Sequence, residues 1–171
     1  MSLANHARTH CHDGLLRPRC YVAIVIDAST RKPLAAPLPA GGLAQAVLGS
    51  QTFERVGNLG ALSVAKAWAP VTRAPPTGDF FRLRGNGIRC VRAPCFSIRV
   101  GRLNTATHTH LASVLDLAGP AGIDAKTLRL AQRALATREG LLGSGRVVAT
   151  PDGGRSFDAT QLYLRSATPR A

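Results

Sequence analysis

FFRLRGNGIRCVRAPCFSIRVGRLN, residues 80–104, predicts two strands joined by a turn and indicates the fold class. The first strand is expected at 80–84. The turn follows at Gly85-Asn86-Gly87, where Asn-Gly accepts positive φ angles. In the second strand Phe96, Ile98 and Val100 alternate with polar residues, which is the period of a half-buried strand. This stretch predicts a β domain.

The sequence after residue 104 predicts three further strands, at 111–117, 142–150 and 156–165, and one helix. Asp124 is a suitable N-cap for that helix, and Gly140 is expected to end it. Its apolar face would hold Leu128, Ala131 and Leu135, opposite a face with Lys126, Arg129 and Arg133. The order of elements from residue 80 onward is therefore β-β-β-α-β-β.

The first half of the chain predicts a shorter β unit, with strands at 21–26, 43–56 and 61–69. Arg17-Pro-Arg-Cys20-Tyr21 is similar to Arg92-Ala-Pro-Cys95-Phe96, and 62–68 is similar to 157–163, so the halves read as weak repeats. The expected fold is mainly β with one helix, in two related small barrel-like units, and an OB-like topology is one option for the second. The expected division is a disordered leader (1–10), a first β unit (11–70), a Pro-rich linker (71–78), a second β unit (79–166) and a tail (167–171).

The four cysteines form two close pairs, Cys11 with Cys20 and Cys90 with Cys95. Four cysteines allow three disulfide connectivities, and spacing alone does not distinguish them. Local pairing is the simplest connectivity and the one we expect. A zinc site built from both pairs is an alternative, although eight residues between ligands match known zinc sites poorly. Free thiols are the third option.

Disulfides form in oxidising compartments, so we expect a secreted, periplasmic or cell-surface protein, or a cytoplasmic one if the thiols are free. The residues before Asp13 contain no apolar segment of the kind found in signal peptides. We therefore expect an exported protein whose N-terminus is truncated or mis-started. No run approaches the roughly 18 apolar residues of a membrane helix, so an integral membrane protein is not expected.

Three segments, 80–84, Cys90-x4-Cys95 and 96–104, resemble a family of uncharacterised exported bacterial domains. In that family a strand, a close Cys pair, a second strand ending in Leu-Asn or Val-Asn, and a later Gly-rich strand recur. The likeness covers roughly residues 79–165, with a weaker echo at 11–69. It implies export, often as a lipoprotein-like or cell-surface protein. It brings no activity and no catalytic residue.

Basic residues outnumber acidic ones, with 22 Lys and Arg against 9 Asp and Glu, and the formal net charge is +13. Only three of the basic residues are Lys. Abundant Arg, Ala, Gly and Pro with scarce Lys is what GC-rich coding bias produces, which is one explanation of the charge. The other explanation is an anionic partner, such as nucleic acid, acidic polysaccharide or lipid headgroups.

The distribution of Arg is the most informative feature of this charge, because no acidic residue lies between Phe80 and Leu103. Cationic and aromatic side chains on a small barrel are how OB folds bind single-stranded nucleic acids. Alternatively, the Phe residues belong to the core and the Arg residues form a solvated face, which we favour because aromatics are only 5% of the chain. The candidate anion-binding residues are Arg82, Arg84, Arg89, Arg92, Arg99 and Arg102.

Sequence signatures of catalysis are lacking. There is no Gly-x-Ser-x-Gly motif and no phosphate-binding loop, and the seven Asp and two Glu lie mostly in predicted turns. His108-x-His110 places two imidazoles on one face of an extended segment without a third ligand, and His10-Cys11-His12 falls in the expected leader. We therefore expect no enzyme activity, no metal and no cofactor.

The expected function is that of a non-catalytic, disulfide-stabilised exported domain that binds a protein or an envelope component. An OB-like protein that binds single-stranded nucleic acid is the alternative. The sequence identifies neither the partner nor the oligomeric state.

Overall fold

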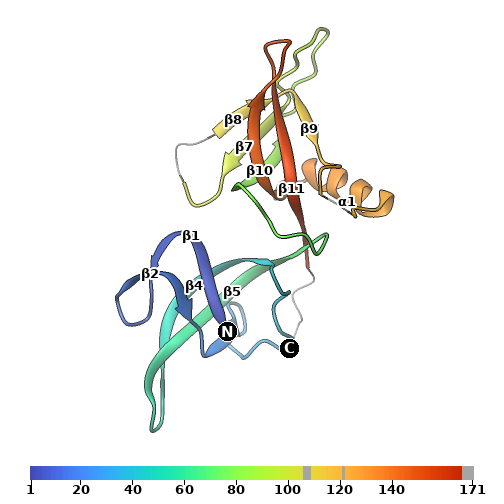
Figure 1. The fold of residues 1–171 in the computed structure, drawn as a ribbon. Helices are drawn as coiled ribbons and strands as arrows, with labels where there is room; N and C mark the ends of the chain where they lie inside the picture. Colours follow the sequence, from blue (N-terminus) through green and yellow to red (C-terminus); the bar gives the residue numbers. More distant parts are fainter. Residues whose placement is uncertain (106–108, 121, 167–171) are drawn as a thin grey trace. The chain divides into compact units, whose positions relative to one another are not determined.

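The computed structural model describes residues 1–105, 109–120 and 122–166 (Figure 1). The described residues are mainly β, with eleven strands and one helix, which confirms the predicted class. Two compact units are present, Met1–Trp68 with the segment from Arg165 onward, and Ala69–Leu164. We call them unit 1 and unit 2. The predicted tail, 167–171, lies outside the described residues.

Unit 1 is built from two antiparallel hairpins and one short parallel strand. Its small core contains Val22, Leu62 and Val64, against which the loop residues Leu34 and Leu38 pack. β1 pairs with β2 and β4 with β5, both antiparallel, whereas β3 runs parallel to β5. The strands are β1 (Ser2–His10), β2 (Leu16–Tyr21), β3 (Ile24–Asp27), β4 (Leu43–Phe53) and β5 (Gly57–Pro70).

The disordered leader expected at residues 1–10 is wrong, because this segment is strand β1. Its polar sequence has no apolar period, but its backbone pairs with β2. Met1 and Val22 add two reciprocal hydrogen bonds, from the Met1 amine to the Val22 carbonyl (2.7 Å) and from the Val22 amide to the Met1 carbonyl (2.9 Å). The strand expected at 21–26 is divided instead between β2 and β3.

Unit 2 contains a curled sheet with the strand order β8-β7-β6-β10-β11-β9. All neighbours in this order are antiparallel except β9 and β11, which are parallel. The buried core includes Phe81 and Phe157, whose ring centroids lie 5.3 Å apart, together with Leu83 and Val100. The elements are β6 (Asp79–Gly85), β7 (Ile98–Arg102), β8 (Thr109–Ala112), β9 (Val114–Asp116), α1 (Ala125–Leu135), β10 (Leu141–Ala149) and β11 (Arg155–Arg165).

The single strand expected at 111–117 is two short strands that meet at Ser113. β8 pairs with β7 and β9 pairs with β11, so the chain changes partner between them. Ser113 sits at this change: its amide donates to the Arg155 carbonyl (2.8 Å) and its hydroxyl accepts from the Arg155 amide (3.2 Å). Because β8 and β9 are adjacent in the chain and lie at opposite ends of the strand order, the sheet curls back on itself.

Helix α1 begins and faces the core as predicted. The Asp124 carboxylate accepts a 2.6 Å hydrogen bond from the Thr127 amide, and this bond holds the pKa of Asp124 below its ordinary 3.8. Ala131 is fully buried, and Leu128 and Leu135 pack against the core beside it. The helix ends at Leu135, earlier than the predicted stop at Gly140. Gly140 has φ +76° and leads the chain into β10.

The segment 71–78, expected to be a Pro-rich linker, belongs to unit 2 and is held against β11. Val71 packs on the core, and its amide donates to the Leu162 carbonyl (2.9 Å). Gln161, which is fully buried, donates to the carbonyls of Thr72 (3.0 Å) and Ala74 (2.8 Å). The sequence alone suggested a linker because the residue that supplies these hydrogen bonds lies nearly 90 positions away in the chain.

The hairpins β4–β5 and β10–β11 have the same register irregularity. In unit 1 the pairing shifts after Gln45, which faces Lys66, and in unit 2 it shifts after Ser144, which faces Gln161. In each unit the parallel pairing begins five residues before that partner, at Ala61 of β5 opposite β3 and at Ser156 of β11 opposite β9. Equivalent positions in the two units are therefore 95 residues apart in the chain. The similar segments 62–68 and 157–163 have the same separation. The units thus share the arrangement of their last strands.

Candidate functional site

Both cysteine pairs are oxidised in the local connectivity. Cys11 is bonded to Cys20 and Cys90 to Cys95, with Cα–Cα distances of 5.3 and 5.5 Å. No thiolate is therefore left to bind zinc or to act as a nucleophile. Two formed disulfides are typical of proteins that fold in an oxidising, extracytoplasmic environment.

The described residues contain no group of three or more His, Cys, Asp or Glu side chains arranged to hold a metal ion. His108 of the His108-x-His110 motif lies outside the described residues. In His10-Cys11-His12 the Cys11 sulfur is consumed by the disulfide. Nor does the described part of the chain contain a helix long and apolar enough to span a bilayer.

Replacing Cys90 and Cys95 by Ser is expected to lower the free energy of unfolding by about 2 kcal/mol. The reason is that a loop this short restricts the unfolded chain only modestly. The matched change at Cys11 and Cys20, which close a longer loop, should cost slightly more. Urea unfolding of both variants measures the two values. Peptide mapping under non-reducing conditions that found crossed pairs would contradict the connectivity.

The second disulfide, between Cys90 and Cys95, lies within the loop 86–97 that joins β6 and β7. Asn86 spans its base: its side-chain amide donates to the Phe96 carbonyl (2.8 Å), and its backbone amide donates to the Ser97 carbonyl (2.9 Å). The Ile88 amide in turn donates to the Asn86 side-chain oxygen (3.0 Å). β7 therefore starts at Ile98, two residues later than the sequence predicts, because Phe96 and Ser97 belong to this closure.

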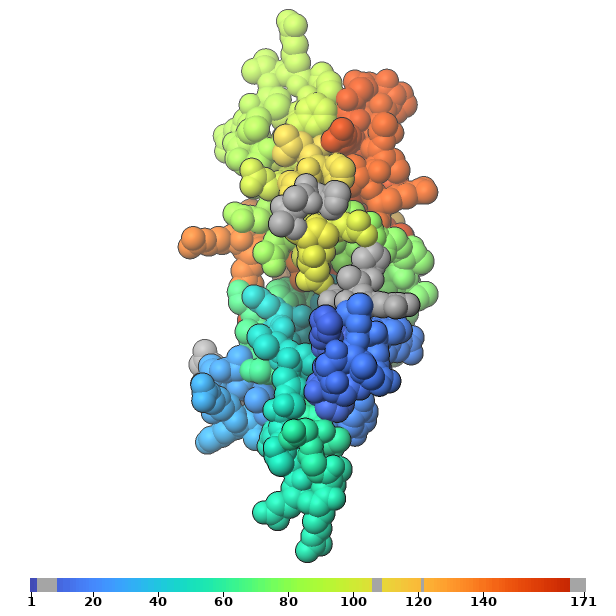
Figure 2. Space-filling model, turned by 90° about the vertical axis from the view of Figure 1, so that its left-hand side faces the viewer, coloured from blue at the N-terminus to red at the C-terminus, as the bar shows by residue number. Residues whose placement is uncertain are grey.

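The stretch 88–92, which we call the apex of loop 86–97, exposes two aliphatic side chains, although the Ile88 amide is also tied to Asn86 at the base. Val91 is fully exposed (102%) and Ile88 is 53% exposed, and Arg89 and Arg92 lie beside them in the chain. Figure 2 shows the yellow-green segment that contains this loop projecting from its unit. Apolar side chains held out in water by a disulfide-closed loop are the most conspicuous surface feature that sequence reasoning missed. Their alternation with Arg was the available signal.

The six candidate Arg residues do not form one cluster. Phe81 and Leu83 point into the core, so the alternating residues Arg82 and Arg84 lie on the outer face of β6. Arg84 is directly opposite Arg99 of β7 in the antiparallel register. All three guanidinium groups are exposed, and within the described residues none has an ion pair. We call Arg82, Arg84 and Arg99 the outer Arg face.

The sixth residue, Arg102, lies on the other side of the sheet. It faces Phe81 in the register, and its guanidinium donates to the Asp79 carboxylate at 2.9 Å. Both side chains are about two-thirds shielded from solvent. Arg102 is thus engaged by an acid of its own sheet, which removes it from the predicted anion-binding set as a free cation.

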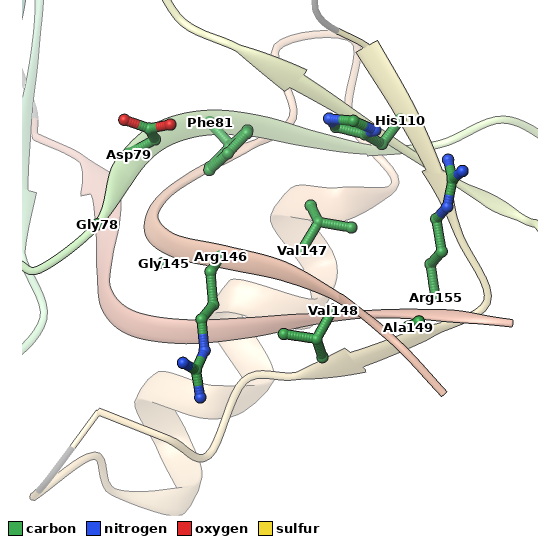
Figure 3. A pocket seen from close by; sticks show the side chains of 10 residues that line it. All are labelled: Gly78, Asp79, Phe81, His110, Gly145, Arg146, Val147, Val148, Ala149 and Arg155. Carbon is green, nitrogen blue, oxygen red and sulfur yellow. The ribbon is translucent and has the colours of Figure 1, made fainter. Parts of the chain in front are cut away.

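An open pocket of about 560 Å³ lies on this inner side of the sheet, away from the outer Arg face. Figure 3 shows Phe81 and Val147 at its floor, while Arg155 rises toward the strand that holds His110. Arg146 extends away from it. The charged lining is mixed, because the Asp79 carboxylate lines the pocket as well as Arg155, and sequence reasoning did not bring these residues together.

One family model matches residues 1–169, nearly the whole chain, and its description is "Domain of unknown function (DUF6748)". The chain belongs to the DUF6748 family. No curated protein and no solved structure matches this DUF6748 chain. The family resemblance seen in the sequence is therefore confirmed, and the Cys90–Cys95 pair that marks it closes the loop described above. DUF6748 membership supplies no activity, so function has to be argued from the surface.

Proposed function

We propose that this DUF6748 chain is an exported, non-catalytic domain that binds a phosphate-bearing polymer of the cell envelope through its outer Arg face. The observation that supports this most directly is the pair Arg84 and Arg99, which are cross-strand neighbours. Like charges directly opposite each other on a sheet destabilise it. Coding bias accounts for many Arg residues, but not for two of them at facing positions without a described carboxylate partner.

Unit 1 provides an internal comparison. Its first hairpin, β1–β2, also has a disulfide and carries two Arg residues on its second strand, and one of them, Arg17, is paired with Asp13 at 2.9 Å. The corresponding hairpin of unit 2 leaves Arg82, Arg84 and Arg99 available to an external anion. Two disulfides support an extracytoplasmic site of action, where phosphate polymers are among the anions that the protein can meet.

Replacing Arg82, Arg84 and Arg99 by Ser tests this proposal with inorganic polyphosphate as the probe. Each phosphate contact releases counterions, so the slope of log affinity against log salt should flatten by about 0.7 for each Arg removed. We expect affinity at low salt to fall on the order of 100-fold. Replacing the exposed Arg129, Arg133 and Arg138 by Ser is the control, because it removes the same charge elsewhere. An equal loss in both variants would show that only net charge matters and would overturn the proposal.

Binding of single-stranded nucleic acid is the second candidate. The curled sheet with a helix between β9 and β10, and two half-buried Phe residues, Phe80 and Phe96, favour it. The oxidised cysteines argue against a cytoplasmic role, and Phe81 belongs to the core. Base stacking would make an oligothymidine bind much more tightly than polyphosphate of equal charge. We expect equal affinity for the two probes.

A further inference from the structure

We propose that loop 86–97 docks the protein on an anionic lipid bilayer, with Ile88 and Val91 inserted at the membrane interface. The inference rests on the proposed function and adds its setting: the outer Arg face binds its polymer beside a lipid surface, which loop 86–97 contacts.

The exposed aliphatic side chains at the apex support its insertion into a membrane interface. Val91 is fully exposed and Ile88 more than half exposed, and neither packs on the body of unit 2. The disulfide and the Asn86 hydrogen bonds hold the loop closed. Because the loop is already ordered, insertion of its apex costs little additional conformational entropy.

The charges around the apex complement a lipid surface. Arg89 and Arg92 alternate with the aliphatic residues, and Arg84 and Arg99 stand at the base of the same hairpin. The segment from Phe80 to Leu103 contains no acidic residue to repel headgroup phosphates. A basic residue near an anionic membrane surface strengthens binding about fivefold. These four Arg residues should therefore give the loop a much higher affinity for an anionic membrane than a neutral loop has.

A bilayer fits the apex better than a protein partner does. A stable protein interface buries about 800 Å² on each side and matches shape. The apex offers two exposed aliphatic side chains, each followed by an Arg, and apolar side chains beside basic ones are also what interfacial helices present to a membrane. A membrane interface accepts such a tip without a complementary pocket.

The test uses the whole chain and vesicles of phosphatidylcholine, with or without one-third phosphatidylglycerol. Val91→Trp places a fluorescent reporter at the apex, while the native Trp68 is buried and provides the background. We expect a blue shift and quenching by brominated lipid only with the anionic vesicles. Binding without any spectral change at position 91 would overturn insertion.

Two variant pairs measure how much the aliphatic apex and its Arg residues each contribute to vesicle binding. Val91→Asp should weaken vesicle binding at least tenfold, whereas Val47→Asp, at a 72% exposed site on β4, should change it less than twofold. The double change Arg89→Ser with Arg92→Ser should weaken it about 25-fold, against a few-fold at most for Arg129→Ser with Arg133→Ser.

The outcomes separate the two proposals. Polyphosphate binding that depends on the outer Arg face, without vesicle binding, would overturn the membrane inference and leave the proposed function intact. If neither probe binds, both fail. Equal loss of vesicle binding in Val91→Asp and Val47→Asp would also overturn the membrane inference, because the apex would then have no special role.

Discussion

Ala131→Asp is expected to abolish cooperative folding of unit 2. The Ala131 side chain is fully buried where α1 packs on the sheet, beside Leu128 and Leu135. A carboxylate there either remains ionised without a partner or takes up a proton, and in both cases it also lacks space. Buried unpaired charge and overpacking are among the few changes that cost more than about 4 kcal/mol, a large share of the stability of a small domain.

Gln132→Asp is the matched control, because it places the same residue at the next, exposed position of α1. Its cost should stay below about 1 kcal/mol, which is the scale of helix propensity. Thermal unfolding followed by circular dichroism compares the two variants. Similar midpoints would show that the assignment of the buried face is wrong.

Gln161→Ala is expected to release the segment 71–77 and to lower the free energy of unfolding by about 3 kcal/mol. The buried side-chain amide satisfies the carbonyls of Thr72 and Ala74, and its oxygen accepts from the Leu162 amide at 3.0 Å. Each buried backbone group left without its partner costs about 1–3 kcal/mol.

Limited proteolysis provides a local measure of the same change. Arg73 lies in the clamped segment, so trypsin should cleave after it at least ten times faster in Gln161→Ala than in the native chain. Gln51→Ala, at an exposed position of β4, is the control and should leave that rate unchanged. An unchanged rate in both variants would mean that Gln161 does not hold the segment.

Local features of this fold follow from short-range physics and are readable in the sequence. Asp124 caps α1 because its carboxylate reaches an amide three residues on. The apolar face of the helix and the alternation in β7 follow from the periods of the two structures. The pairs Cys11–Cys20 and Cys90–Cys95 are close in the chain, so local pairing was the simplest connectivity to expect, and it is the one formed.

The predictions that were wrong concern segments whose partners are distant in the chain, or whose pairing leaves no pattern in the side chains. Strand β1 forms although its sequence is polar, because backbone groups make the pairing. The change of partner at Ser113 depends on Arg155, 42 residues away.

For the candidate site, the sequence was enough to predict an acid-free, Arg-rich hairpin with a small disulfide loop. How its cations are divided follows from the folded sheet: Arg102 pairs with Asp79, 23 residues away, whereas Arg84 faces Arg99. Likewise, only the structure shows that Val91 is exposed and Phe81 buried, since both are apolar residues in similar local patterns. The physical reason is that burial and pairing depend on which strands become neighbours, and strand register is a property of the whole sheet.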